Sequence, residues 1–204
     1  MTDDEAAFEA ASRAAFDAGQ LDQVAARLIE RHGSVILAFL RDRLRDEGEA
    51  REIYAQFMED LWRGLPGFGF RASLRSWAYT LARHAAARHL RDPRRRQGRN
   101  QALPEDSRME PPLADRRSQT PPYKQTEMKE RLRALRRQLS EEDQTLLVLR
   151  VDQNFSWEEL LEVLEESRSE GEQRSKELAR LRQRFKRAKD QLRKLAEDEG
   201  LLPV

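Results

Sequence analysis

The sequence is short and strongly charged, which limits what it can form. Its 204 residues are 38% hydrophobic and 37% charged, enough for one large or two small cores but not for a thick multilayer core. It has no cysteine, which excludes disulfide frameworks and thiolate metal sites. No apolar run approaches membrane-spanning length, and the acidic start MTDDEAAFEA is unlike a signal peptide. We therefore expect a cytoplasmic protein without a membrane partner.

Positive charge is concentrated in two blocks, although the net charge is only +1. From Arg71 to Arg99 there are nine arginines and one acid, and from Arg174 to Lys194 there are ten basic residues and two acids. Between the blocks, residues 157–172 carry seven glutamates and one arginine. Separated basic blocks indicate contacts with a polyanion at two places.

The first part of the chain has the apolar periodicity of three or four helices. A first helix should end before Gly48 and carries Leu21, Val24, Leu28, Val35, Ile36, Phe39 and Leu40. The segment AREIYAQFMEDLWRGL places Ile53, Phe57 and Leu61 on one side of a second helix. The loop LPGFGF then interrupts the pattern, and SLRSWAYTLARHAAARHLRD forms the last helix of this module.

That last helix, residues 73–92, combines an apolar stripe with a basic surface. The stripe consists of Leu74, Trp77, Leu81 and Ala85. Trp77 is either a core residue or a platform for an unstacked base. Phe57 and Trp62 on the preceding helix are each either a core residue or an interface residue. Phe68 and Phe70 lie in a glycine-flanked loop and are candidates for exposed aromatic rings.

Residues 93–125 have the composition of a flexible linker. Six of the eight prolines lie from Pro93 to Pro122, and the segment lacks hydrophobic periodicity. A coil of this length would span roughly 30 Å on average. The sequence thus predicts an N-terminal module at residues 15–92 and a C-terminal module at residues 126–202.

The C-terminal module has clear helix starts. Ser140 with Asp143, and Ser156 with Glu159, both fit a capping box, in which side chains and backbone amides pair reciprocally. They precede helices at EEDQTLLVLRV and WEELLEVL. The final helix has an apolar stripe at spacings of three and four, formed by Leu178, Leu181, Phe185, Ala188, Leu192 and Leu195.

Two short helices followed by a basic amphipathic helix predict a helix-turn-helix. Opposite the apolar stripe the final helix carries the cationic and amide side chains Lys176, Arg180, Gln183 and Arg187. Such a face suits a DNA major groove. A solvated helix or a short coiled coil would carry the same pattern, so charge alone leaves both alternatives open.

Taken together, these pieces resemble a bacterial RNA polymerase sigma factor of the extracytoplasmic-function (ECF) group of the sigma-70 family. The segment from AREIYAQFMEDLW to ARHAAARHLRD looks like region two of that family. The segments LSEEDQTLLVLRVDQNFSWEELLEVL and RLRQRFKRAKDQLRKL look like region four. The resemblance covers roughly residues 21–92 and 128–200. It implies an all-α protein in which a region-two-like helical bundle and a region-four-like helix-turn-helix are joined by the Pro-rich linker.

The resemblance also implies roles for particular residues. Glu52, Gln56 and Phe57 would dock on core RNA polymerase, close to Trp62. Phe70 and Trp77 match a promoter-melting segment together with Ala82, Arg83 and Leu90. Contacts to the minus-10 promoter element are expected from Phe68, Phe70, Arg71, Arg75, Arg83 and Arg91. Contacts to the minus-35 element are expected from Lys176, Arg180, Gln183, Arg184 and Arg187.

The chain departs from the family pattern at several places. Arg51 stands where an acid is usual, Arg88 replaces an aspartate, and His84 replaces an asparagine. EESRSEGEQRSK, residues 165–176, replaces a tight turn between the two DNA-contacting helices. This insertion should project outward or extend the last helix backward.

The expected partners are core RNA polymerase and promoter DNA, with an anti-sigma factor as a possible regulator. No catalytic residue, metal or cofactor is expected, because polymerase performs the chemistry; His84 and His89 lie five apart and point away from each other on a helix. Two alternatives remain from the residues themselves. One is a helix-turn-helix regulator that binds DNA without polymerase, and the other is a helical adaptor that pairs with proteins through its leucine stripe.

Overall fold

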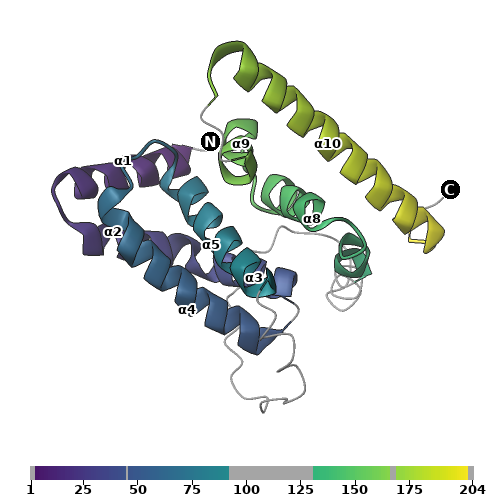
Figure 1. Ribbon diagram of the computed structural model, residues 1–204, viewed down its shortest axis with the longest axis horizontal. Coiled ribbons are helices and arrows are strands. Elements are labelled where there is room, and N and C mark those ends of the chain that lie inside the picture. The colour runs from purple at the N-terminus through teal and green to yellow at the C-terminus, as the bar shows by residue number, and fades with distance from the viewer. Residues whose placement is uncertain (1–2, 45, 92–130, 166–168, 202–204) are drawn as a thin grey trace. The chain divides into compact units, whose positions relative to one another are not determined.

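The computed structural model describes residues 3–44, 46–91, 131–165 and 169–201. Every regular element in these ranges is helical and none is a strand, which confirms the predicted all-α class. The chain divides into two compact units, one containing helices α1 to α5 and the other helices α8 to α10 (Figure 1). The predicted linker, residues 93–125, lies outside the described residues.

Five α-helices lie in the described part of the N-terminal unit. They are α1 (Asp3–Asp17), α2 (Leu21–Leu28), α3 (Ser34–Leu44), α4 (Glu47–Gly64) and α5 (Leu74–Arg91). A π-helical turn, η1 (Ile29–Gly33), continues α2 into α3, and a 3-10 turn, η2 (Leu65–Gly67), follows α4. The predicted helix from Leu21 is therefore present as α2, η1 and α3, whereas α1 begins well before residue 15 and was not predicted.

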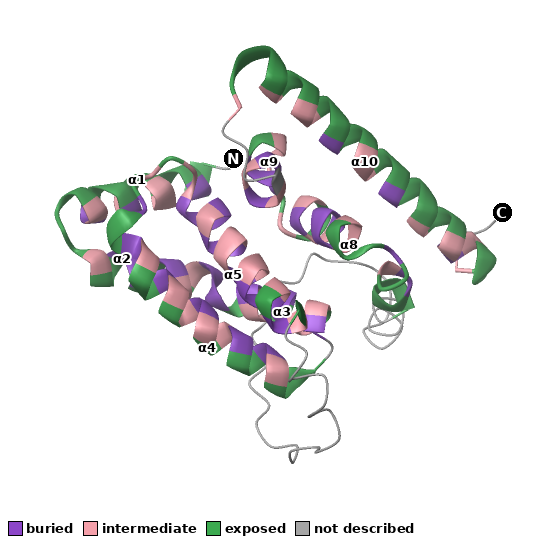
Figure 2. Cartoon of the chain, in the orientation of Figure 1, coloured by how far each residue is buried: buried purple, intermediate pink, exposed green. Residues whose placement is uncertain are grey.

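The core of this unit lies where α3, α4 and α5 pack against one another (Figure 2). Its largest fully buried side chains include Leu28, Ile36, Leu40, Phe57, Leu61, Leu74 and Tyr79. Asp46 caps the start of α4, where its carboxylate accepts a hydrogen bond from the Glu49 amide at 2.7 Å. This cap starts α4 before the predicted boundary, so Gly48 lies inside the helix rather than between helices.

The buried face of α5 is rotated from the predicted stripe. Leu74 and Ala85 are buried, but Trp77 and Leu81 are only partly covered. Small side chains fill the remaining contact positions, namely Ala78, Ala82 and Ala86. Alanines let α5 approach its neighbours closely, and the bulkier Trp77 and Leu81 then lie at the edge of the contact.

The π-helical turn η1 ends in close contact with α4. Gly33 lies against Tyr54 of α4, and a β-carbon at residue 33 would lie 2.6 Å from the Tyr54 hydroxyl oxygen. The turn also places Arg31 and His32 beside α1, where both contact Glu5. The connection between α2 and α3 thus serves packing on two sides.

The C-terminal unit contains a helical segment at residues 131–136, then α8 (Glu141–Leu147), a π-helical turn η3 (Val148–Asp152), α9 (Trp157–Glu165) and α10 (Gly171–Asp198). Both short helices start as predicted, but only one capping box is complete. The Ser156 amide donates to Glu159 at 2.8 Å and the Glu159 amide donates to the Ser156 hydroxyl at 3.2 Å. At α8 the Asp143 amide donates to Ser140 at 3.2 Å, but the Asp143 carboxylate accepts from the Ser140 hydroxyl instead of from its amide.

The apolar stripe of α10 packs against α8 and α9. Leu181 and Ala188 are buried, and Phe185, Leu192 and Leu195 pack against the cluster formed by Leu139, Leu147 and Ala188. The predicted stripe is therefore confirmed. Because α10 begins at Gly171, the second part of the insertion extends this helix backward, which was one of its two expected outcomes.

Candidate functional site

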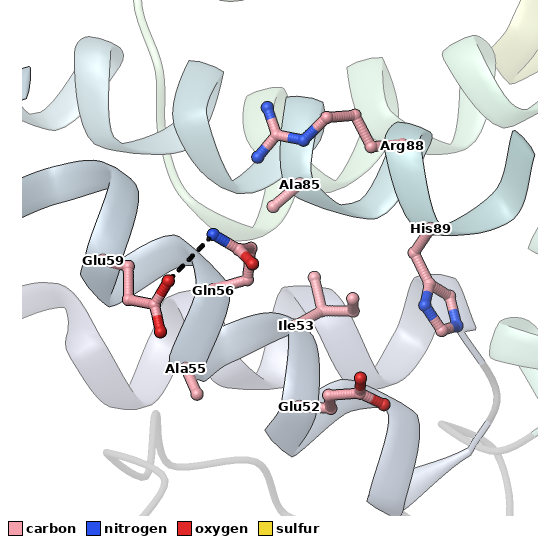
Figure 3. Close-up of a pocket in the computed structure, with 8 residues that line it drawn as sticks. All are labelled: Glu52, Ile53, Ala55, Gln56, Glu59, Ala85, Arg88 and His89. Atoms are coloured by element: carbon pink, nitrogen blue, oxygen red, sulfur yellow. Dashed lines mark hydrogen bonds between the residues drawn. The ribbon is translucent and has the colours of Figure 1, made fainter. Parts of the chain in front are cut away.

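The predicted docking residues lie on α4 beside a pocket of about 370 Å³ between α4 and α5 (Figure 3). Glu52 is exposed and Gln56 is half-buried, and both line the pocket. The Gln56 amide donates to Glu59 and to Asp60, each at 3.3 Å. Phe57 differs: it is 0% exposed, so the structure assigns it to the core rather than to a docking surface. Trp62 is 48% exposed, so it stays a candidate for the interface.

Arg88 of α5 pairs across this pocket with Asp60 of α4. His89 lies one residue further along α5, and its Nε2 is 3.3 Å from Glu49 of α4, with the ring almost fully buried. The arginine that replaces the family's aspartate therefore has an acidic partner on the neighbouring helix. Arg51, the other charge reversal, pairs with Glu47 one turn earlier at 3.0 Å.

The loop before α5 contains a stack of aromatic rings. Phe68 lies parallel to Trp77 of α5, with ring centroids 4.5 Å apart and an interplanar angle of 25°. Its other neighbour is Phe70, with centroids 4.8 Å apart. Phe68 is only 9% exposed, so the prediction that it presents a free ring is wrong: Trp77 covers it. Phe70 is partly exposed and adopts a positive φ of 49° after Gly69.

The predicted minus-10 arginines fall into two groups. Arg71 and Arg91 are exposed and Arg83 is partly exposed, so their charges can reach a phosphate chain. Arg75 is buried, with its Nε 3.6 Å from Glu5 of α1. Its assignment as a DNA contact is therefore corrected to an internal ion pair.

Glu5 is the centre of that buried ion pair. Burial alone would raise the pKa of its carboxyl, but a hydrogen bond with His32 and the charges of Arg75, His32 and Arg31 outweigh it and lower the pKa to about 2. Arg31 also pairs with Asp4 at 2.5 Å. These contacts fasten α1 to η1 and α5. Sequence periodicity did not reveal them, because the partners are far apart along the chain.

In the C-terminal unit, Arg180, Gln183 and Arg187 are exposed on α10. Lys176 is also exposed and pairs with Glu172 at 2.7 Å. These four residues recur at helical spacing and share one face. They form a basic face opposite the apolar stripe, on a helix that is fixed to the rest of the unit.

Arg184 helps to fix α10 to α8 and is not part of the basic face. Its guanidinium pairs with Asp143 at 2.6 Å and with Glu142 at 2.5 Å, both on α8. Burial would raise the pKa of Asp143, but hydrogen bonds from Ser140 and Arg184 and the charges of Arg184 and Arg187 lower it. The assignment of Arg184 as a base or phosphate contact is therefore corrected to a tie between α10 and α8.

Trp157, the first residue of α9, makes a second tie to α10. The guanidinium groups of Arg150 and Arg182 lie 4.7 Å and 5.7 Å from its ring centroid. Phe185 of α10 meets the same ring edge-on, with centroids 5.4 Å apart. Together these contacts join the start of α9 to α10 and to η3.

Comparison with known families gives one match. Residues 28–96 match the family model of Sigma-70 region 2, a span that runs from the end of α2 through α5. No curated protein matches the chain. Of the helices described in the structure, none is both long enough and apolar enough to cross a membrane.

The matched span contains α4 with Glu52 and Gln56, the loop with Phe68 and Phe70, and α5. Within the N-terminal unit, residues 28–96 are accordingly a sigma-70 region 2 domain. A sigma-70 region 2 domain indicates a sigma factor, a non-enzymatic protein that binds core RNA polymerase for promoter-specific initiation.

Proposed function

We propose that this sigma factor belongs to the ECF group and contacts its promoters through two modules. Residues 15–92, together with α1, bind core polymerase and recognise and open the minus-10 element. Residues 126–202 read the minus-35 element through α10, and residues 93–125 connect the two. The protein acts in the cytoplasm, where polymerase transcribes, and the resemblance implies an anti-sigma partner.

The observation that carries this proposal is the basic face of α10 in a unit separate from the matched domain. Lys176, Arg180, Gln183 and Arg187 are exposed, while the opposite face of the same helix packs on α8 and α9. A cationic, amide-bearing helix face with a fixed back is the form that enters a major groove. A helical adaptor would instead need its leucine stripe exposed, but that stripe packs inside the unit.

In the N-terminal unit, Glu52 and Gln56 form the docking surface and Trp62 extends it. The strand-holding surface consists of Phe70, Arg71, Arg83 and Arg91, which remain at least partly exposed. Arginines would hold the phosphates of the opened strand, and the ring of Phe70 would offer a shoulder to an unstacked base. These surfaces are supported by side chains buried beneath them, namely Phe57, Phe68 and Arg75.

The deciding experiment is run-off transcription by purified core polymerase on a library of genomic fragments. Addition of this protein should start transcripts at a defined subset of fragments that share two sequence elements. A variant without residues 126–204 should lose the upstream element of that pair. If no fragment supports initiation above core polymerase alone, the proposal is wrong.

The docking surface has its own test in Gln56→Ala. We expect core polymerase affinity to fall by about 1–2 kcal/mol, because a hydrogen-bonding group at the interface is lost. Arg51→Ala is the matched control, since Arg51 lies on the same helix but points away from Gln56. Equal affinity of Gln56→Ala and the parent in a fluorescence titration would remove Gln56 from the interface.

A further inference from the structure

Helix α1 lies outside the matched span and packs across the start of α5. The carboxylate of Glu9 accepts hydrogen bonds from the backbone amides of Leu74 at 3.0 Å and Arg75 at 3.3 Å. The first amides of a helix have no partner within the helix and need one from outside. Here two of them are capped by a residue about 65 positions earlier in the chain.

Ser73 completes the cap. Its hydroxyl accepts from the Ser76 amide at 3.0 Å, and its carbonyl accepts from the Trp77 amide at 3.0 Å. Glu9 therefore supplies the two acceptors that the local sequence cannot provide. The negative charge also lies at the positive end of the helix dipole, where it is stabilising.

The same helix α1 also contacts the aromatic loop just before Ser73. The ring of Phe16 meets Phe70 edge-on, with centroids 5.2 Å apart, and the guanidinium of Arg13 lies 5.0 Å from the Phe70 centroid. Phe70 has a positive φ, which a non-glycine residue keeps only when its surroundings hold it. Helix α1 thus contacts the loop at Phe70 and the start of α5 at Leu74.

Partial burial of the Glu9 carboxylate costs free energy, which argues that its cap has a role. Burial raises the pKa of its carboxyl, and the neighbouring charge of Glu5 adds to this, while the amides of Leu74 and Arg75 and the charge of His32 oppose it. The two helix amides therefore stabilise the charged carboxylate at this partly buried position.

We propose that Glu9 is a positioning residue for promoter opening: its cap fixes the start of α5, and with it the loop that holds the opened strand. This rests on the proposed role of the loop and of α5 in opening the minus-10 element. Glu9 itself does not touch DNA. Its effect is on strand opening and not on polymerase binding, because the docking face on α4 lies on another helix.

The test compares Glu9→Ala and Glu9→Gln with Asp3→Ala, an exposed acid on the same helix, in full-length protein with core polymerase. Amide hydrogen exchange reports the cap directly at Leu74 and Arg75. Initiation is measured at a promoter recovered from the run-off screen, once as intact duplex and once with the minus-10 region already unpaired. Core affinity is measured in parallel.

For Glu9→Ala we expect about tenfold faster exchange at both amides and about tenfold slower open-complex formation on duplex, the factor that corresponds to loss of a typical N-cap. Initiation on the unpaired template and core affinity should stay within twofold of the parent. Glu9→Gln keeps one acceptor oxygen and should fall between Glu9→Ala and the parent. Asp3→Ala should behave as the parent.

Parent-like opening of the duplex by Glu9→Ala would overturn the proposal, whatever the exchange rates. A parallel loss on both templates together with core affinity would also overturn it, since Glu9 would then only stabilise the fold. Should Glu9→Ala not fold, Glu9→Gln decides between these outcomes. Failure of the proposed function would be visible in the parent itself, which would then initiate at no promoter.

Discussion

The arginines of α10 differ in what surrounds them, although the sequence presents them as one series. Arg180 and Arg187 are exposed, whereas Arg184 is bound to two acids of α8. Arg180 lies closer to the start of the helix, where side chains of a recognition helix reach base edges; Arg187, further along, should meet phosphates. The three residues should therefore give three different phenotypes.

Arg180→Ala should relax preference at one or two minus-35 positions, by about 1–3 kcal/mol against a wrong base. Arg187→Ala should weaken binding evenly across sequences and lower the salt slope by about one ion. Arg184→Ala should cost roughly 0.5–1 kcal/mol of folding stability and leave base preference unchanged. Titration against a minus-35 library at several salt concentrations, with urea unfolding of each variant, separates the three. Identical binding by all variants would mean that this face does not read DNA.

The folding stability of the protein at acid pH also depends on a single residue, Glu5. Its folded pKa of about 2 lies below its ordinary value of 4.5, so its contribution is present above pH 4.5 and is lost as the pH falls toward 2. The shift corresponds to about 3 kcal/mol. Glu5→Gln should be less stable than the parent by about that amount at pH 7, and the difference should shrink between pH 4.5 and 2. Urea unfolding across this range measures it; a constant difference would show that the ion pair does not titrate.

Individual site residues were predictable only where exposure follows from helix position. The exposed face of α10 was predicted from spacing alone, and so was its apolar stripe. Phe68 and Arg75 were misassigned because Trp77 and Glu5 cover them, and neither contact leaves a local sequence signal. The sequence left open whether Phe57 is a core or an interface residue, and in the structure it is buried in the core.

At the scale of elements, η1 links a steric detail to the course of two helices. The space beside Gly33 is occupied by the Tyr54 hydroxyl, so no side chain fits there without movement. A π-helical turn shifts the following helix relative to the preceding one, which brings Gly33 against α4 and His32 against α1. The turn therefore fixes the positions of α1, α3 and α4 relative to one another.

Gly33→Ala should destabilise the N-terminal unit by about 1–3 kcal/mol, because the new methyl group overpacks the contact with Tyr54. Tyr54→Phe removes the hydroxyl and should recover part of this loss when the two changes are combined. A double-mutant cycle of urea unfolding measures the coupling. Additive effects would show that the methyl group and the hydroxyl do not meet.

Most elements could be predicted because amphipathic helices have a recognisable hydrophobic period and recognisable capping residues in the sequence. The helices from Leu21, at residues 50–65, at residues 73–92 and in the C-terminal unit all appear close to their predicted positions. The exception is α1, whose sequence DDEAAFEAASRAAFD has few large apolar residues. Its contacts with η1 and α5 are carried by the buried Glu5 and the partly buried Glu9, and from sequence acids are expected to be solvent-exposed.

At the scale of the whole molecule, the proposed function depends on two DNA contacts on one chain. If residues 93–125 only connect them, a Gly/Ser tract of equal length should preserve promoter selectivity. A linker cut to half should abolish simultaneous engagement, because the effective concentration vanishes when a tether cannot reach. Run-off transcription on two-element promoters measures both variants. Normal initiation with the halved linker would refute the two-site geometry.

The cap that Glu9 places on α5 also bears on how the N-terminal unit is made. During synthesis Glu9 and Phe16 leave the ribosome early, but their partners at Phe70 and Leu74 follow some 55 to 65 residues later. Contacts that close so long a stretch of chain form late and slow folding. A nascent chain that stops before Leu74 leaves the Glu9 carboxylate and the Phe16 ring in water. We therefore expect the contacts of α1 with the loop and with α5 to form late in folding, after Leu74 has been made.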